Sequence, residues 1–130
     1  MAPRTRPISP HLEVYRFTLT MAMSIVHRIT GVANYAGTLL LVAWLGAAAL
    51  GEAPLALVDT LFGSWPGQVV LFGYTWSLFH HMLGGLRHFV WDSGRMLDPA
   101  GRELIVRIQV VSSVLLTLAA WALFVWNAAP

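Results

Sequence analysis

Histidines and small residues lie close together in the apolar stretch 69–90. His81 and His88 are seven residues apart, so they share one face if this stretch is helical. A neutral imidazole in apolar surroundings is a typical axial ligand of haem iron, and adjacent glycines let a flat macrocycle approach the backbone. The polar and small residues concerned are Ser77, His80, His81, Gly84, Gly85, Arg87 and His88.

The residues alone leave two questions open. The histidines could be packing residues bonded to neighbouring helices, with Gly84 and Gly85 as a helix contact. His80 also competes with His81 as a ligand, because it lies only about 100° further around the helix.

A low-spin haem needs a second axial ligand. Stretch 108–126 contains no His or Met. His27, Met21 and Met23 of the first span lie close to its inner edge, less deep than His81, so we expect that ligand to come from a partner chain.

A second cluster, Ser24, His27 and Arg28, precedes the first long apolar stretch. Separations of three and four residues place these side chains on one helix face. At the rim of an apolar cavity, a hydroxyl and a guanidinium can each donate a hydrogen bond to a quinone carbonyl, which becomes negative on reduction. Arg28 could also neutralise haem propionates. The alternative is an arginine that extends to the lipid interface.

The composition predicts that membrane helices position these residues. Hydrophobic residues make up 57% of the 130 residues and charged residues only 11%, against about 25% charged in ordinary globular domains. A soluble domain of this size cannot bury so much apolar surface. The composition therefore excludes a soluble bundle, a disordered chain and a nucleic-acid-binding domain. Because the chain has no cysteine, it holds no disulfide, iron–sulfur cluster or thiol nucleophile.

Three apolar segments are long enough to cross a bilayer, which needs about 20 apolar residues of helix. We expect transmembrane helices at about 22–50, 67–91 and 105–127, and loops at 51–66 and 91–103. Residues 1–20 form a cytoplasmic arm, and three prolines make its first eleven residues extended. The expected fold is thus a single all-α membrane-anchor domain, residues 1–130.

The arginines predict the orientation of this domain. All eight lie before the first span, at its start, or around the second loop: Arg4, Arg6, Arg16, Arg28, Arg87, Arg95, Arg102 and Arg107. The positive-inside rule then places the N-terminus inside and the C-terminus outside. Tryptophans near the span ends, Trp65, Trp91, Trp121 and Trp126, fit interfacial aromatic belts. Both polar clusters fall in the inner half of the membrane.

Two motifs resemble a known family. The first joins RPISPHLEVYR at 6–16 to SIVHRITG at 24–31, and the second is HMLGGLRH at 81–88, followed by Trp91-Asp92. They are similar to those of the cytochrome b membrane anchors of succinate dehydrogenase (succinate:quinone oxidoreductase, respiratory complex II). The resemblance covers essentially the whole chain and includes both motifs in the same order.

The resemblance implies roles for individual residues. It selects His81 rather than His80 as the axial ligand of the haem iron. It implies that Ser24 and Arg28 line the ubiquinone pocket, and that His27, Arg28 and His88 approach the haem propionates.

The resemblance also implies partners. A flavoprotein oxidises succinate, an iron–sulfur subunit carries the electrons, and two three-helix anchors share one haem b and form the ubiquinone site. This chain would be half of that two-chain anchor bundle in the respiratory chain, and not an enzyme alone. The alternatives are a fumarate reductase anchor and a cofactor-free structural membrane subunit. Arg-only basic residues, many Ala and Trp, and no transit peptide favour a bacterial inner membrane over a mitochondrial one.

Overall fold

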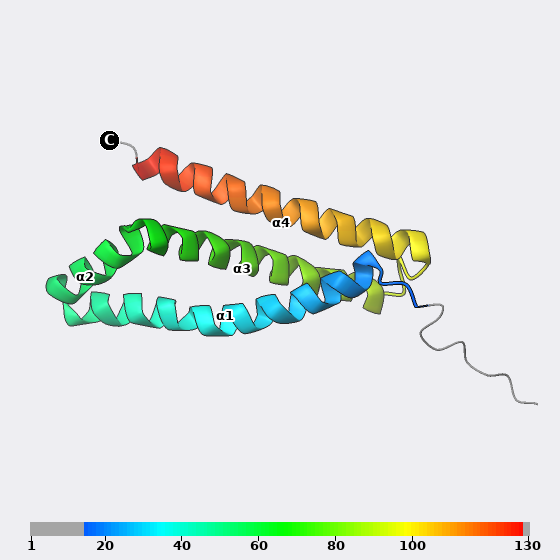
Figure 1. The fold of residues 1–130 in the computed structure, drawn as a ribbon, viewed down its shortest axis with the longest axis horizontal. Coiled ribbons are helices and arrows are strands. Elements are labelled where there is room, and N and C mark those ends of the chain that lie inside the picture. Colours follow the sequence, from blue (N-terminus) through cyan, green and yellow to red (C-terminus); the bar gives the residue numbers. More distant parts are fainter. Residues whose placement is uncertain (1–14, 129–130) are drawn as a thin grey trace, which may run out of the picture.

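The computed structural model describes the backbone of residues 15–128 and the side chains of residues 15–125. In this part the chain forms four helices: α1 (Leu19–Leu50), α2 (Glu52–Gly63), α3 (Trp65–Asp92) and α4 (Pro99–Ala128). Figure 1 shows an elongated arrangement, with α2 at one end and the α3–α4 connection at the other. Most of the predicted arm, residues 1–14, lies outside the described residues.

The predicted loop at 51–66 is wrong, because it contains helix α2. Gly51, at φ 115°, separates α1 from α2. Pro54 lies in the first turn of α2, where a missing N–H costs no intrahelical hydrogen bond. Ser64 then caps α3 by accepting a hydrogen bond from the backbone N–H of Gly67 at 3.3 Å. The Gly and Pro residues that predict a loop here lie instead at or near the ends of helices α2 and α3.

The third predicted helix begins earlier than expected, at Pro99 instead of residue 105. Proline fits the first position of a helix because its fixed φ is helical and its missing N–H is not needed there. The carboxylate of Asp98 accepts a hydrogen bond from the backbone N–H of Gly101 at 3.0 Å, as an N-cap residue does. The second loop therefore shrinks from 91–103 to 93–98.

Two helices, α1 and α4, are long and apolar enough to cross a membrane. Helices α2 and α3 meet at a bend of 80° and add a third candidate span if the bent pair is one span. Histidines and an arginine make α3 less apolar than its neighbours. The structure therefore supports an all-helical chain with two to three candidate membrane spans.

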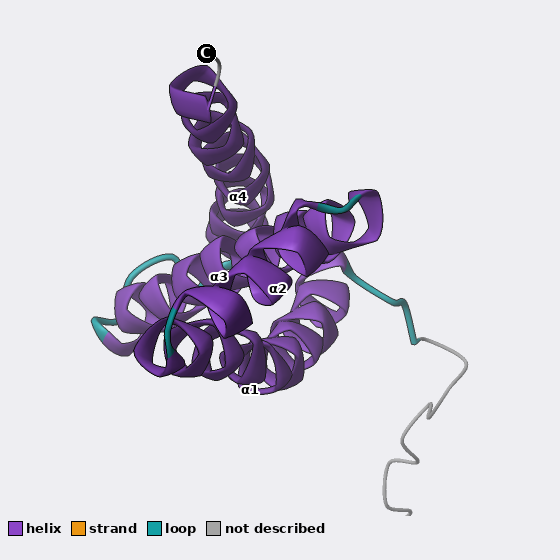
Figure 2. Ribbon diagram, turned by 90° about the vertical axis from the view of Figure 1, so that its left-hand side faces the viewer, coloured by secondary structure: helices purple, strands orange, loops and turns teal. Residues whose placement is uncertain are grey.

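The packing between the helices is polar. Helix α3 contacts the other three helices, and α4 diverges from α1 towards its C-terminal end (Figures 1 and 2). Within the described residues, the buried apolar side chains are Ala47 and Val106. The buried polar side chains are Thr30, Ser77, His80, Arg87, Gln109, Ser113 and Thr117. This distribution is typical of membrane helices, whose apolar side chains face lipid and whose polar groups find partners between helices.

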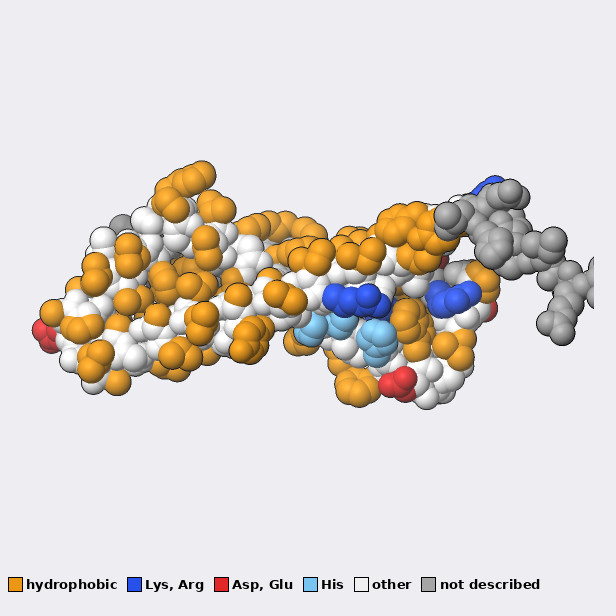
Figure 3. All heavy atoms as spheres, turned by 60° about the horizontal axis from the view of Figure 1, so that its bottom comes forward, with side chains coloured by type: hydrophobic (Ala, Val, Ile, Leu, Met, Phe, Trp, Pro, Cys, Tyr) orange, Lys and Arg blue, Asp and Glu red, His pale blue; other side chains and the backbone are white. Residues whose placement is uncertain are grey.

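The molecule divides into two halves of different chemistry. We call residues 15–34 and 77–113 the arginine half, and residues 35–76 and 114–125 the α2 half. All arginines and histidines of the described chain lie in the arginine half. Figure 3 shows arginine and histidine side chains side by side on one face, while the rest of that face, towards α2, is mostly hydrophobic. The cationic and imidazole side chains of the described chain therefore belong to the arginine half.

Candidate functional site

Two imidazole rings stack between α1 and α3. The ring centroids of His27 and His81 lie 4.1 Å apart, with 6° between the ring planes. Each ring packs against a glycine of the other helix. A Cβ on Gly31 would lie 3.0 Å from Cε1 of His81, and a Cβ on Gly84 would lie 2.8 Å from Cε1 of His27. The stacked pair therefore depends on the small size of both glycines.

The hydrogen bonds of His81 define its tautomer. Its Nδ1 lies 3.0 Å from the carbonyl oxygen of His27 and 3.4 Å from the Thr30 hydroxyl. The Thr30 hydroxyl donates its own proton to the same carbonyl at 2.9 Å, so Nδ1 of His81 carries a hydrogen and donates it to His27. Nε2 then holds the lone pair, and it has no hydrogen-bond partner within the described chain. A metal ligand needs such a nitrogen, with the other ring N–H fixed by an acceptor.

His80 has the opposite environment, because it faces α4. Only 1% of its surface is exposed. The Gln109 amide donates to Nε2 of His80 and to its carbonyl oxygen, both at 3.1 Å. Nδ1 therefore carries the hydrogen and donates to the Ser113 hydroxyl at 3.3 Å. Both ring nitrogens are engaged, so His80 is a packing residue here.

The two adjacent glycines differ from each other. Gly84 is buried, and a Cβ there would meet both His27 and the Gln109 amide nitrogen, the latter at 3.1 Å. Gly85 has nothing within 4 Å of the position of its missing Cβ. The expectation that both glycines leave room for a flat group is wrong for Gly84, which makes a helix contact. For Gly85 it stays a prediction.

Ser77 extends the α1–α3 contact towards the middle of the helices. Its hydroxyl lies 2.7 Å from Oδ1 of Asn34 and 3.1 Å from the carbonyl oxygen of Thr30. Ser77 is buried and lies one turn before His81, on the face that the spacing predicts. These bonds fix the rotation of α3 against α1, and so fix the direction in which His81 points.

His88 and Arg87 lie where α3 approaches its end. The exposed His88 ring lies 5.7 Å from the ring of His27 and edge-on to Trp91 at 5.4 Å. Arg87 is only 3% exposed, and its guanidinium carbon lies 4.8 Å from the centre of the Trp91 ring. Its Nε and Nη1 atoms have no hydrogen-bond partner. The structure thus brings His27, His81 and His88 together, with a buried cation nearby.

Ser24 and Arg28 lie one turn apart on α1, and Arg28 directly follows His27. Ser24 is half-buried and Arg28 is exposed. Within residues 15–125 neither side chain has a hydrogen-bond partner, so their donors are available to a group from outside the chain. The sequence predicts these positions from spacing alone, and the structure adds that both donors are unused.

Sequence reasoning quotes Thr30 and Gly31 within the motif at 24–31 but gives them no role, and it does not name Gln109. In the structure Thr30 and Gly31 contact the ring of His81, and Gln109 holds His80. Gln109 could have been found, because an amide in an apolar membrane helix is costly unless it is paired. The burial of Arg87 could also have been found, because it lies seven residues after His80 and therefore on the same helix face.

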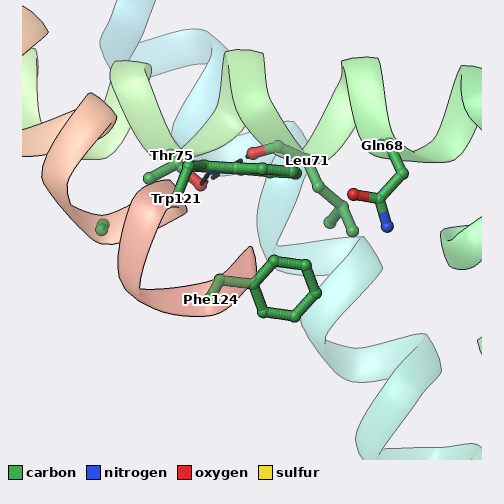
Figure 4. Close-up of a pocket in the computed structure, with 6 residues that line it drawn as sticks. Gln68, Leu71, Thr75, Trp121 and Phe124 are labelled. Carbon is green, nitrogen blue, oxygen red and sulfur yellow. Dashed lines mark hydrogen bonds between the residues drawn. The ribbon is translucent and has the colours of Figure 1, made fainter. Parts of the chain in front are cut away.

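The α2 half contains a pocket of another kind. Its volume is about 290 Å³, and it is lined by Gln68, Leu71, Thr75, Ala120, Trp121 and Phe124. Figure 4 shows the rings of Trp121 and Phe124 on α4 beside Leu71 of α3, with Trp121 donating a hydrogen bond to Thr75 at 3.2 Å. No charged or histidine side chain lines this pocket, so it offers packing and not redox or acid–base chemistry.

Bare metal ions have no site in the described residues, because no three His, Asp or Glu side chains converge on one point. His81 offers one open nitrogen. One protein nitrogen is enough for a metal whose remaining ligands come from a prosthetic group.

Comparisons with known proteins identify the family of the chain. Residues 2–120 match the family described as succinate dehydrogenase/fumarate reductase transmembrane subunit. The chain is 39% identical over 119 residues to the succinate dehydrogenase cytochrome b556 subunit of Paracoccus denitrificans, covering 92% of each chain. It is 42% identical over 120 residues to the mitochondrial cytochrome b560 subunit of Sus scrofa, covering 84% of this chain and 68% of the relative. It is 32% identical over 116 residues to the cytochrome b556 subunit of Rickettsia prowazekii, covering 89% of this chain and 90% of the relative.

Proposed function

Because the chain belongs to the family of succinate dehydrogenase/fumarate reductase transmembrane subunits, we propose that its arginine half binds one haem b through His81 and helps form a ubiquinone site. The chain is a cytochrome b membrane-anchor subunit of succinate dehydrogenase. It has no part in the dicarboxylate chemistry, and its role is to receive electrons in the membrane. The haem supplies one-electron transfer between ferric and ferrous iron.

One observation carries the haem proposal: the N–H of His81 is held by the His27 carbonyl at 3.0 Å, and its Nε2 is open. A carbonyl acceptor on the second nitrogen orients a ligating histidine and raises its basicity. Gly85, one helical turn further along the same face, leaves open space at its missing Cβ, which supports the approach of a flat group. His80 lacks an open nitrogen, so it does not compete.

A haem held by His81 would take its second protein ligand from a partner anchor. His27 is stacked in parallel on His81 at 4.1 Å, and two rings so arranged cannot bind opposite faces of one macrocycle. Helix α4 contains no His or Met, and the methionines of α1, Met21 and Met23, lie at the start of that helix, before His27. A low-spin b haem therefore needs a ligand from another chain, which makes this subunit half of a shared haem site.

The charges of the site suit the haem propionates. Arg28 is exposed and can pair with a carboxylate through two parallel hydrogen bonds. His27 and His88, whose rings lie 5.7 Å apart, present further ring N–H groups at the same end. We assign these three side chains to the propionates.

Ser24 and Arg28 form this chain's part of the quinone site. Their hydroxyl and guanidinium lie on one face of α1 and have no partner in the described chain. Both can donate hydrogen bonds to a ubiquinone carbonyl oxygen, and such bonds strengthen as negative charge develops on that oxygen. Reduction of the quinone is thereby favoured at this position.

The orientation follows from charge. All described arginines lie in the arginine half, which the positive-inside rule places at the cytoplasm. The flavoprotein and iron–sulfur subunits then dock at that side, next to the polar cluster. We assign the chain to a bacterial inner membrane, with the N-terminus inside and the C-terminus outside.

The test uses the complete complex, purified in detergent together with its partner chains. We expect a b-type band in the reduced-minus-oxidised absorption spectrum and about one haem per flavin, as one haem shared between two anchors requires. The band should disappear in His81→Ala and persist in His80→Ala, which loses only a packing network. A haem band that survives in His81→Ala, or that disappears in an assembled His80→Ala complex, would contradict the ligand assignment.

A further inference from the structure

Three helices meet at Gly84 of α3. Gly84 is buried, and the imidazole of His27 from α1 and the amide of Gln109 from α4 both lie against it. A Cβ at this position would overlap Nδ1 of His27, lie 2.8 Å from Cε1 of His27, and lie 3.1 Å from Nε2 of Gln109. No side chain larger than a hydrogen atom fits there unless His27 moves.

His27 in turn holds the ring of His81 in two ways. Its imidazole is stacked on that of His81, with centroids 4.1 Å apart and planes 6° apart. Its carbonyl oxygen accepts the Nδ1 hydrogen of His81 at 3.0 Å. The ring also contacts the Thr30 hydroxyl, 3.4 Å from Nδ1, and Gly31, whose missing Cβ would lie 3.0 Å from Cε1 of His81. The orientation of His81 thus depends mainly on where His27 lies.

We propose that Gly84 is a positioning residue for the haem ligand: its lack of a side chain seats His27, and the seated His27 sets the plane in which His81 presents Nε2. This inference rests on the proposed function, because it takes His81 as the ligand. The orientation of a ligating histidine and its hydrogen bond tune the electronic state of the metal. A change at Gly84, which packs against His27 and Gln109, should therefore reach the haem through His27.

A purely structural glycine would behave differently. If Gly84 only let the helices approach each other, its replacement would lower the stability of the complex and leave the haem spectrum unchanged. The spectrum therefore separates a positioning role from a packing role.

The experiment compares Gly84→Ala with Gly73→Ala in the complete complex. Gly73 also lies in α3 and has nothing within 4 Å of its missing Cβ, and both variants gain the same helix propensity. The readouts are the electron paramagnetic resonance g values and the midpoint potential of the haem. We expect both to shift in Gly84→Ala and to match the wild type in Gly73→Ala. Unshifted g values and midpoint potential in Gly84→Ala would overturn the proposal.

A double variant tests the route through His27. In a His27→Ala background, the added methyl of Gly84→Ala no longer meets an imidazole, so the two changes should be strongly non-additive. An equal shift from Gly84→Ala in both backgrounds would contradict the route. If Gly84→Ala alone fails to assemble, the double variant should restore assembly, and a failure to restore it would also contradict the proposal.

The proposed function and the positioning role of Gly84 can fail separately. A wild-type complex that contains no haem would defeat the proposed function. A wild-type complex with haem whose spectrum is unaffected by Gly84→Ala would defeat only the positioning role of Gly84.

Discussion

The two halves of the α1–α3 contact pack in the same way but place different rings in the contact. In the α2 half, Gly37 of α1 accommodates the ring of Tyr74, and a Cβ on Gly37 would lie 2.7 Å from Cζ of that ring. In the arginine half, Gly31 accommodates His81. Tyr74 and His81 are seven residues apart and therefore lie on the same face of α3. One face of one helix thus repeats a single packing arrangement, a ring against a glycine, in both halves.

The difference shows what packing alone cannot specify. The phenol ring of Tyr74 fills the contact with carbon, whereas the imidazole of His81 fills the same kind of contact and leaves Nε2 open. Glycines opposite rings therefore indicate close helix packing, and the type of ring decides whether a metal can be bound.

The α3–α4 contact shows the same contrast. In the arginine half, Gln109 holds both the ring and the backbone of His80. In the α2 half, one hydrogen bond joins Trp121 to Thr75. The denser network lies beside the proposed ligand, where a fixed helix rotation has a functional consequence.

Apart from loss of the haem ligand itself, the largest effect should come from the unpaired donors of the arginine half. Arg28→Leu and Ser24→Ala each remove a donor to a developing negative charge, worth about 1.5–3 kcal/mol, or about 10- to 100-fold in rate. We expect succinate-driven quinone reduction to fall by that factor, while succinate oxidation with an artificial dye is unchanged. Thr38→Ala is the matched control for Ser24→Ala, because its exposed hydroxyl bonds only to Tyr35 of its own helix. Unchanged quinone kinetics in both site variants would remove the quinone assignment.

A stability effect of intermediate size should come from Gly37, the glycine that packs against the Tyr74 ring. Gly37→Ala forces a methyl group into the Tyr74 ring, and such overpacking costs about 1–3 kcal/mol. The thermal unfolding temperature of the complex should drop, with the haem spectrum unaltered. Gly46→Ala, which has nothing within 4 Å of its missing Cβ, is the control. A haem spectrum changed by Gly37→Ala would contradict the claim that packing in the α2 half does not affect the haem.

The smallest effect should come from the pocket of the α2 half. Trp121→Phe keeps an aromatic ring and removes the hydrogen bond to Thr75, at a cost of about 0.5–1.5 kcal/mol. Thermal unfolding should detect this small loss, with haem content and quinone kinetics as in the wild type. Trp65→Phe, at a side chain that is 78% exposed, should change none of these. A slower quinone reduction in Trp121→Phe would assign this pocket a role in the reaction.

Much of the fold could be predicted from the sequence because membrane helices are encoded locally, by runs of apolar residues. The two missed features, helix α2 and the early start of α4 at Pro99, have a common cause: proline and glycine mark loops and helix ends alike. The predicted site residues fall on the expected helices. The choice between His80 and His81 could not be made from spacing, because it depends on which helix packs against each face of α3.

The most direct test of the difference between the halves is the haem-to-flavin ratio of two purified complexes, Tyr74→Ala and His81→Ala. Each variant removes one ring from the same face of α3, so both lose packing and stability. We predict that the Tyr74→Ala complex keeps the haem content of the wild type and that the His81→Ala complex contains none. Equal haem content in the two assembled complexes would contradict the assignment of His81 as the ligand.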